Sequence, residues 1–318
     1  MRRLAFLLFM LAAPAAAQMA DQRAYRLAVL NPSAASADFT RSVTLLELAK
    51  LGFREGLNLV VDERVGDAEK MGELVRELLL AKPDAIIAIG PDAISAASQA
   101  TSTVPIVMFG NDPVRKGVAV SLARPGGNVT GVAILGTELD GKRLDLLREA
   151  VPAARRVAAL MLSSSPDRAT SEAEMRGVAA KTGIELVVLD VSGPSDYPAA
   201  FTAMPGAGAQ ALIIVANAIF YRDAEALARL ALQAGLPTAC EWAEMARSGC
   251  LLGYGPSRTA LRRRLAYFVA RIFQGAAPGE LPIETPTLFE FAINLKTAHA
   301  LDLGIPPAVL SRADEVIE

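Results

Sequence analysis

The chain has 318 residues, of which 52% are hydrophobic, 21% are charged and 5% are aromatic, and its formal net charge is −2. This length is enough for about two domains with a sizeable core. The small net charge and the sequence pI of about 5.7 exclude the basic footprint of a nucleic-acid-binding protein, so we expect no nucleic-acid partner.

The N-terminus has the pattern of a secretory signal peptide. Two arginines precede an apolar run at 4–13, which is too short to span a bilayer, and small residues follow Pro14. We expect residues 1–17 to be cleaved, leaving an exported, soluble, periplasmic protein. A retained N-terminal anchor is the alternative. The cleavage site carries no cysteine, which argues against a lipoprotein.

Runs of apolar, β-branched residues alternate with helical patterns in the first half of the chain. The runs at 26–30, 58–65, 84–90 and 105–110 predict strands. Apolar residues at helical spacing lie between them, and Asp67 is the expected N-cap of the second helix. The residues at helical spacing are Phe39, Val43, Leu46, Ala49 and Phe53 in the first segment, and Met71, Leu74, Leu78 and Leu79 in the second.

The second half repeats this alternation, with strands predicted at 155–162, 184–191, 210–217 and 236–242. The two halves share a pattern rather than residue identities. Continuous apolar strands separated by amphipathic helices are typical of parallel sheets covered on both faces. We therefore expect an α/β protein with two Rossmann-like lobes.

The junction between the lobes is expected at the glycine-rich stretch 124–131, with further crossings near 253–256 and 284–291. The resulting boundaries place 18–132 with about 256–285 in the first lobe. The second lobe then contains 133–255 with about 286–318.

The two cysteines, Cys240 and Cys250, lie close together in the second half. Because oxidation is the default in an exported chain, we expect a disulfide, and a pair of buried thiols is the alternative. Two cysteines and the single His299 make a structural zinc site very improbable, so no metal is expected.

Polar side chains follow the predicted strands, where open parallel sheets bind ligands beyond their carboxyl ends. For each of these residues, local capping of a turn is the alternative. The candidate ligand-binding residues at these ends are Asn31, Ser33, Gly90, Pro91, Asp92, Ala93, Asn111, Asp112, Ser163, Ser164, Asn217, Tyr221, Glu241 and Trp242, and Tyr254 is a further stacking candidate.

No catalytic machinery is recognisable in the sequence. It has no G-x-S-x-G elbow, no P-loop and no G-x-G-x-x-G after a strand, and a Ser-His-Asp system is hard to build from His299 alone. A solvated helix face explains the basic run at 261–265 better than a phosphate site does. We therefore expect no enzyme and no cofactor, but a clamshell that closes by a hinge over a small molecule.

Four motifs carry a family resemblance: D-P-V at 112–114, L-A-R-P-G-G-N-V-T-G at 122–131, Y-G-P at 254–256, and the tail I-N-L-K-T-A…L-G-I-P-P…L-x-R-A-D-E-V-I at 293–317. With them, the mature chain resembles the ABC transporter substrate-binding protein family that includes tryptophan/tyrosine-binding lipoproteins. The resemblance implies the type I periplasmic-binding-protein fold, with three crossovers between the lobes. It also implies a monomer that delivers a small solute to a membrane permease, which a separate ATPase drives.

The sequence departs from many relatives after the strand at 236–239. Relatives have small or hydroxylated residues there, whereas this chain has Glu241 and Trp242. Trp242 could stack on a planar ligand or pack beneath the segment 240–250. The resemblance favours an aromatic amino acid or related aromatic acid, and an aliphatic amino acid or another small carboxylate is the alternative.

An α-amino acid needs partners for both of its charges, since burying either one unpaired is costly. Backbone N–H groups at 91–93 or Ser33 are the candidates for its carboxylate. Asp112, Asp92 and Glu241 are the candidates for its ammonium group.

Two other classes of function remain open. One is a ligand-sensing protein, either the core of a regulator or a protein that acts on a membrane sensor. No helix-turn-helix pattern precedes residue 26, which disfavours a DNA-binding regulator. The other is a hydrolase or isomerase on the same scaffold, which needs a convergent nucleophile and base.

Overall fold

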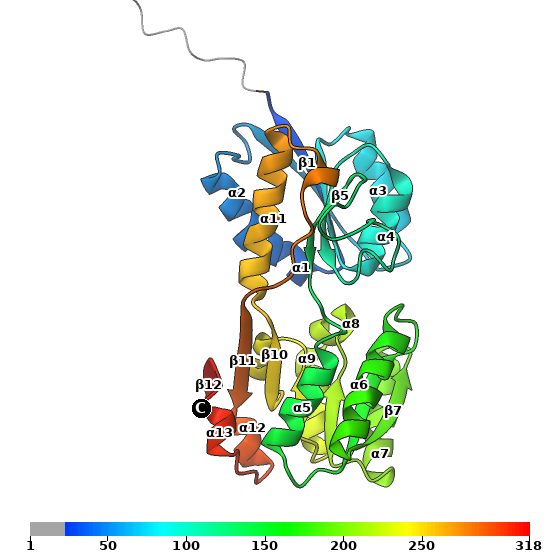
Figure 1. Cartoon of the computed structure of the whole chain (residues 1–318), viewed down its shortest axis with the longest axis vertical. Coiled ribbons are helices and arrows are strands. Elements are labelled where there is room, and N and C mark those ends of the chain that lie inside the picture. Colours follow the sequence, from blue (N-terminus) through cyan, green and yellow to red (C-terminus); the bar gives the residue numbers. More distant parts are fainter. Residues whose placement is uncertain (1–22) are drawn as a thin grey trace, which may run out of the picture.

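The computed structural model describes residues 23–318, so the expected signal peptide at 1–17 lies outside the described residues. Within 23–318, no helix combines the length and the apolar character needed to cross a membrane. The described chain forms two lobes that are stacked along the long axis and joined at a narrow waist (Figure 1).

The first lobe is built on a parallel sheet with strand order β2-β1-β3-β4-β5. All residues of its β3, β4 and β5 are buried, as expected for strands covered by helices on both faces. The strands are β1 (Tyr25–Asn31), β2 (Leu59–Val65), β3 (Ala85–Ile89), β4 (Ile106–Gly110) and β5 (Val129–Ala133).

Two helical layers cover this sheet, and Figure 1 shows them on opposite sides. One layer contains α1 (Ala34–Phe39), the π-helical segment η1 (Thr40–Leu45), α2 (Leu46–Lys50) and the long α11 (Arg258–Phe273). The other contains α3 (Met71–Leu80) and α4 (Pro91–Ala100), and the short η3 (Pro278–Glu280) lies beside β5.

Two helix predictions in this lobe were wrong in detail. Asp67 is not the N-cap of α3: the helix begins at Met71, and its N-cap Lys70 makes no side-chain capping bond. In the preceding helical segment, Leu46 is 60% exposed. The buried face of this segment carries hydroxyl groups beside Ala37 and Leu48. Two of them, on Ser36 and Thr40, bind Arg262 of α11, and an apolar periodicity cannot reveal such a polar face.

The second lobe is built on a sheet with strand order β12-β11-β10-β9-β8-β6-β7. Its strands pair in parallel except for β10 and β11. The strands are β6 (Arg156–Leu162), β7 (Glu185–Val191), β8 (Ala211–Ile214), β9 (Thr238–Cys240), β10 (Leu252–Pro256), β11 (Phe289–Asn294) and β12 (Glu315–Ile317).

Helices cover both faces of this sheet as well. They are α5 (Asp140–Ala150), α6 (Arg168–Thr182), η2 (Pro194–Asp196), α7 (Tyr197–Gly206), α8 (Ala218–Arg222), α9 (Ala224–Gln233), α10 (Ala243–Arg247), α12 (Leu295–Ala300) and α13 (Pro307–Leu310). The two-lobed α/β architecture with parallel sheets was expected from the alternation of strand and helix patterns, and it is confirmed.

Between residues 23 and 318 the chain passes from one sheet to the other three times. The crossings are 134–139 between β5 and α5, Ser257 between β10 and α11, and 281–288 before β11. The third crossing runs beside the end of β5, which leads into the first crossing, since Ala133 N donates to Glu284 O at 2.9 Å. The carboxyl ends of β5 and β10 lead directly into this waist, so loops after the strands of both lobes meet there (Figure 1).

Candidate ligand-binding site

The loop after β9 brings Glu241 and Trp242 into the region between the lobes. Each is only 5% exposed. Their main chain lies directly on β10, where a Cβ at Gly255 would be 2.2 Å from the Glu241 carbonyl oxygen and a Cβ at Gly253 would be 2.2 Å from that of Trp242. The two glycines of β10 are therefore required for the position of this loop.

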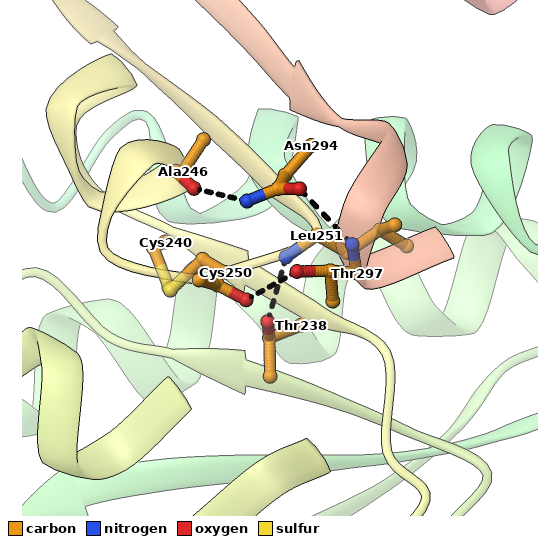
Figure 2. The surroundings of a disulfide bond; sticks show 8 residues. Thr238, Cys240, Ala246, Cys250, Leu251, Asn294 and Thr297 are labelled. Atoms are coloured by element: carbon orange, nitrogen blue, oxygen red, sulfur yellow. Dashed lines mark hydrogen bonds between the residues drawn. A yellow bond between two sulfur atoms is a disulfide. The ribbon is translucent and has the colours of Figure 1, made fainter. Parts of the chain in front are cut away.

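A disulfide joins Cys240 to Cys250 immediately before this loop, with an S–S distance of 1.98 Å (Figure 2). Hydrogen bonds hold the same segment: Leu251 N donates to Thr238 Oγ1 at 3.0 Å, and Asn294 Nδ2 donates to Ala246 O at 2.8 Å. Both sulfurs are buried in the second lobe. The main chain that carries Glu241 and Trp242 is thus fixed at both of its ends.

The Glu241 carboxyl lies where the two lobes and the first crossing meet. A Cβ at Gly136, in that crossing, would be 3.3 Å from Glu241 Oε1 and 2.9 Å from Asn111 Nδ2 of the first lobe. Gly136 N donates to Asn111 Oδ1 at 2.8 Å. Burial, with a smaller contribution from nearby Asp140, raises the pKa of Glu241 to about 7 against the opposing effects of Arg143 and Arg258.

A buried ion pair anchors the crossing beside Glu241. Arg143 Nη1 lies 2.7 Å from Asp140 Oδ1, and both side chains are fully buried. Arg143 also donates to the carbonyl oxygens of Gly136 at 2.9 Å, Tyr254 at 2.8 Å and Glu241 at 3.2 Å. Its charge and hydrogen bonds are used within the protein, so this pair has a structural role.

Three aromatic rings surround the Arg258 guanidinium at the start of α11. Its carbon lies 4.1 Å from the Tyr221 ring centre, 4.6 Å from that of Phe39 and 5.5 Å from that of Trp242. Arg258 also donates a hydrogen bond to the Tyr221 hydroxyl. Its ion-pair partner is Glu244, whose Oε1 lies 3.7 Å away. Phe39 belongs to the first lobe and Tyr221 and Trp242 to the second, so Arg258 contacts aromatic residues of both lobes.

Arg262 lies one turn further along α11 and is 1% exposed. It donates to Thr40 Oγ1 and Ser36 Oγ, each at 3.0 Å, and its guanidinium carbon is 4.6 Å from the Phe109 ring centre. Burial, with a smaller effect of Arg258, lowers the pKa of Arg262 to about 9.

The interpretation of 261–265 as a solvated helix face is therefore wrong for Arg262. It holds for Arg263, whose side chain is 58% exposed. The burial of Arg262 follows from its place on α11, because it shares the inward face of the helix with Leu261 and Leu265.

Several of the predicted polar residues cap local structure. Ser33 Oγ accepts from Ser36 N at 3.2 Å, Asn217 Oδ1 from Ile219 N at 2.9 Å, and Asp112 Oδ1 from Arg115 N at 3.2 Å. These bonds match the capping alternative that the sequence left open for each residue.

The remaining predicted residues are distributed around the waist. Asn31 is buried, binding Glu63 through its Nδ2, and Gly90 precedes Pro91, Asp92 and Ala93 in the first turn of α4. Ser163 and Ser164 are exposed in the loop after β6. Tyr254 points to the opposite face of β10, where it packs on Phe289 and Phe291, and so lies apart from Trp242.

An ion pair links the two lobes at the rim. Lys116 Nζ, from the loop after β4, lies 3.0 Å from Asp167 Oδ1, before α6. Arg115 donates from the same loop to Thr170 Oγ1. Burial raises the pKa of nearby Asp92, and Lys116 opposes that shift.

The structure thus brings together Asn111, Tyr221, Glu241 and Trp242 of the predicted set. It adds four residues that were not predicted from the sequence to line the site: Phe39, Phe109, Arg258 and Arg262. The spacing of Arg258, Leu261, Arg262 and Leu265 was a usable signal, since residues three and four apart share a helix face. Within 23–318, no group of three His, Cys, Asp or Glu side chains is placed to hold a metal ion.

Comparisons with known proteins agree with this architecture. A family model described as ABC transporter substrate binding protein matches residues 33–317. A tyrosine-binding protein of Clostridioides difficile is 24% identical over 271 residues, which cover 84% of this chain and 78% of that protein.

Two solved structures are similar over 92% of this chain and 100% of theirs. A conserved domain protein from Vibrio cholerae has a TM-score of 0.86 at 25% identity. An ABC domain from Streptococcus pneumoniae, solved in complex with L-Trp, has a TM-score of 0.85 at 22% identity. The expected type I periplasmic-binding-protein fold is confirmed.

Proposed function

The chain belongs to the family of ABC transporter substrate-binding proteins, and from that premise we propose that it is the extracytoplasmic solute-binding component of an ABC importer. In this role it is a periplasmic monomer that takes up a small molecule between its lobes. It then delivers the molecule, chemically unchanged, to a membrane permease that a separate ATPase drives.

We propose an aromatic amino acid, or a related aromatic acid, as the ligand. The observation that carries this proposal is the buried pair Glu241–Trp242 at the meeting point of the lobes, where a carboxylate and an indole lie on consecutive residues. Trp242 and Tyr221 offer faces for stacking on a planar ring, and Glu241 offers a partner for an ammonium group. The tyrosine-binding relative and the neighbour solved with L-Trp support the same class.

Closure of the lobes is the proposed binding step. The three crossings act as the hinge, and the ion pair Lys116–Asp167 joins the lobes at the rim when they are closed. Asn111 and Gly136 lie beside Glu241, so closure also assembles the polar end of the site from both lobes.

A thermal-shift screen tests the proposal on mature protein that has been unfolded, stripped of ligand and refolded. The screen compares aromatic amino acids, aromatic acids, aliphatic amino acids and other small carboxylates. A ligand at ~100 times its dissociation constant adds about 2.7 kcal/mol to stability, which shifts the melting temperature by several degrees. We expect a shift with tyrosine or tryptophan. A shift with aliphatic amino acids alone would contradict the aromatic assignment.

A further inference from the structure

Arg258 and Arg262 occupy positions that helix electrostatics disfavour. Arg258 is the first residue of α11, where the positive end of the helix dipole repels cations, and Arg262 is the fifth. Like charges four residues apart on a helix repel each other as well. Neither arginine is placed to stabilise α11, so the reason for their positions lies outside the helix.

Arg262 is in addition a buried cation without a neutralising carboxylate. No Asp or Glu oxygen among residues 23–318 lies within 4.0 Å of its guanidinium nitrogens, and its Nε has no hydrogen-bond partner there. Its two partners, the hydroxyls of Ser36 and Thr40, are neutral. A buried charge normally requires a partner of opposite charge, because removing it from water is costly.

The surroundings of the two guanidinium groups suit a planar anion. Phe39, Phe109, Tyr221 and Trp242 exclude water around them, which strengthens a charge-assisted hydrogen bond. The flat, forked guanidinium matches the two oxygens of a carboxylate. Glu244 Oε1 lies 3.7 Å from Arg258, which is too far for a hydrogen bond, so Glu244 does not occupy the forked N–H donors of this guanidinium.

We infer that Arg258 and Arg262 form the anion subsite of the inter-lobe site and bind the carboxylate of the ligand. The inference rests on the proposed function and narrows the range of possible ligands, since a ligand without a carboxylate is excluded. It also replaces the backbone groups at 91–93 and Ser33, to which the sequence assigned this carboxylate.

The position of Glu241 extends the inference to the head group of the ligand. Arg258 is near enough to Glu241 to lower its pKa, and both lie beside Trp242, so the cationic and anionic subsites are adjacent. An α-amino acid carries its ammonium and carboxylate on one carbon atom, as two adjacent subsites of opposite charge require. A ligand whose two charges are separated by a long chain does not meet this requirement.

Calorimetric titration of the mature protein with three indole compounds tests the subsite. L-Tryptophan carries both charges, tryptamine lacks the carboxylate, and indole-3-propionate lacks the ammonium group. We expect Arg258→Gln and Arg262→Gln each to weaken L-tryptophan binding on the order of 100-fold, as for other buried charge pairs that lose one partner. The affinity for indole-3-propionate should fall in the same variants, whereas the affinity for tryptamine should not. Unchanged L-tryptophan affinity, or an equal loss for tryptamine, would overturn the inference.

Arg263→Gln is the matched control, because this exposed neighbour on α11 has the same charge and should leave all three affinities unchanged. The melting temperature of the ligand-free protein gives a second readout that needs no ligand. Because Arg262→Gln removes an uncompensated buried charge, the melting temperature of this variant should equal or exceed that of the wild-type protein. A lower melting temperature, or a failure to fold, would show that Arg262 serves the fold and would overturn the inference.

The two readouts separate this inference from the proposed function. A wild-type protein that binds none of the three compounds, and shows no shift with L-tyrosine, would contradict the aromatic amino-acid proposal. The melting temperature of Arg262→Gln still decides whether its positive charge is a cost to the fold.

Discussion

The guanidinium carbon of Arg258 lies 4.1 Å from the centre of the Tyr221 ring, although the two residues belong to different lobes. Arg258 begins α11 directly after the crossing at Ser257, and Tyr221 lies in α8. Because cation–π contacts in dry surroundings contribute about 2 kcal/mol, this pair stabilises the arrangement of the two lobes in this structure.

Trp242 should contribute to both ligand binding and folding. We expect Trp242→Ala to weaken L-tyrosine binding and to reduce the free energy of unfolding by about 3–5 kcal/mol, as for other buried aromatic residues. Phe220→Ala is the control, since Phe220 is equally buried in α8 and should cost similar stability without loss of affinity. Calorimetry and denaturant unfolding measure the two effects. Equal affinity losses in both variants would assign Trp242 to the core alone.

Glu241 should make the stability of the ligand-free protein depend on pH. Its pKa of about 7 lies above the ordinary value of 4.5, so the folded protein binds this proton more tightly than the unfolded chain does. The resulting stabilisation is complete below the unfolded pKa and is lost as pH rises through 7. Thermal unfolding between about pH 5 and about pH 8 should show a falling melting temperature that is flatter in Glu241→Gln. Parallel profiles would refute the assignment.

The sequence predicted the architecture well, because the repeated apolar strands carry it. Strands β1–β4 and β6–β9 each overlap a predicted run. Strands β5, β10, β11 and β12 were not predicted. Strand β10 was missed because its sequence LGYGP contains glycines and a proline, which are unfavourable in strands. The structure explains the glycines, since the carbonyl groups of Glu241 and Trp242 lie against them.

The candidate site was predicted less completely, because the roles of its residues depend on contacts that only the tertiary structure creates. Ser33, Asp112 and Asn217 occur at strand ends whether they bind a ligand or cap a turn, so the sequence alone could not separate the two roles. Arg262 was hidden for another reason. Its spacing with Leu265 on α11 indicated a shared helix face, but its hydrogen-bond partners Ser36 and Thr40 lie more than two hundred positions away in the chain and could not be identified from the sequence.

The disulfide should stabilise the loop that carries Glu241 and Trp242. Protein purified without reductant should resist alkylation, and Cys240→Ala/Cys250→Ala should lose about 2–3 kcal/mol of stability, the value expected for a loop of this size. Mass spectrometry and denaturant unfolding measure these changes. Two alkylated thiols in the unfolded, unreduced protein would contradict the bridge.

The ion pair Lys116–Asp167 should slow ligand release. We expect Asp167→Asn to increase the dissociation rate by up to about fivefold, because a partly exposed pair contributes up to about 1 kcal/mol. In stopped-flow measurements, the difference in dissociation rate between Asp167→Asn and wild type should become smaller as the ionic strength increases. Lys142→Met is the control, since its pair with Asp145 lies within the second lobe. An equal change in this control would exclude a rim-specific effect.

The most direct measurement uses Trp242, which is the single tryptophan of the chain and lies between the lobes. Ligand-stripped mature protein is titrated with L-tyrosine, and the tryptophan emission is followed with selective excitation. We expect a change in emission that saturates at one L-tyrosine per chain and is absent with leucine. Emission that stays constant through the L-tyrosine titration, or a saturable response to leucine alone, would contradict an aromatic amino-acid site between the lobes.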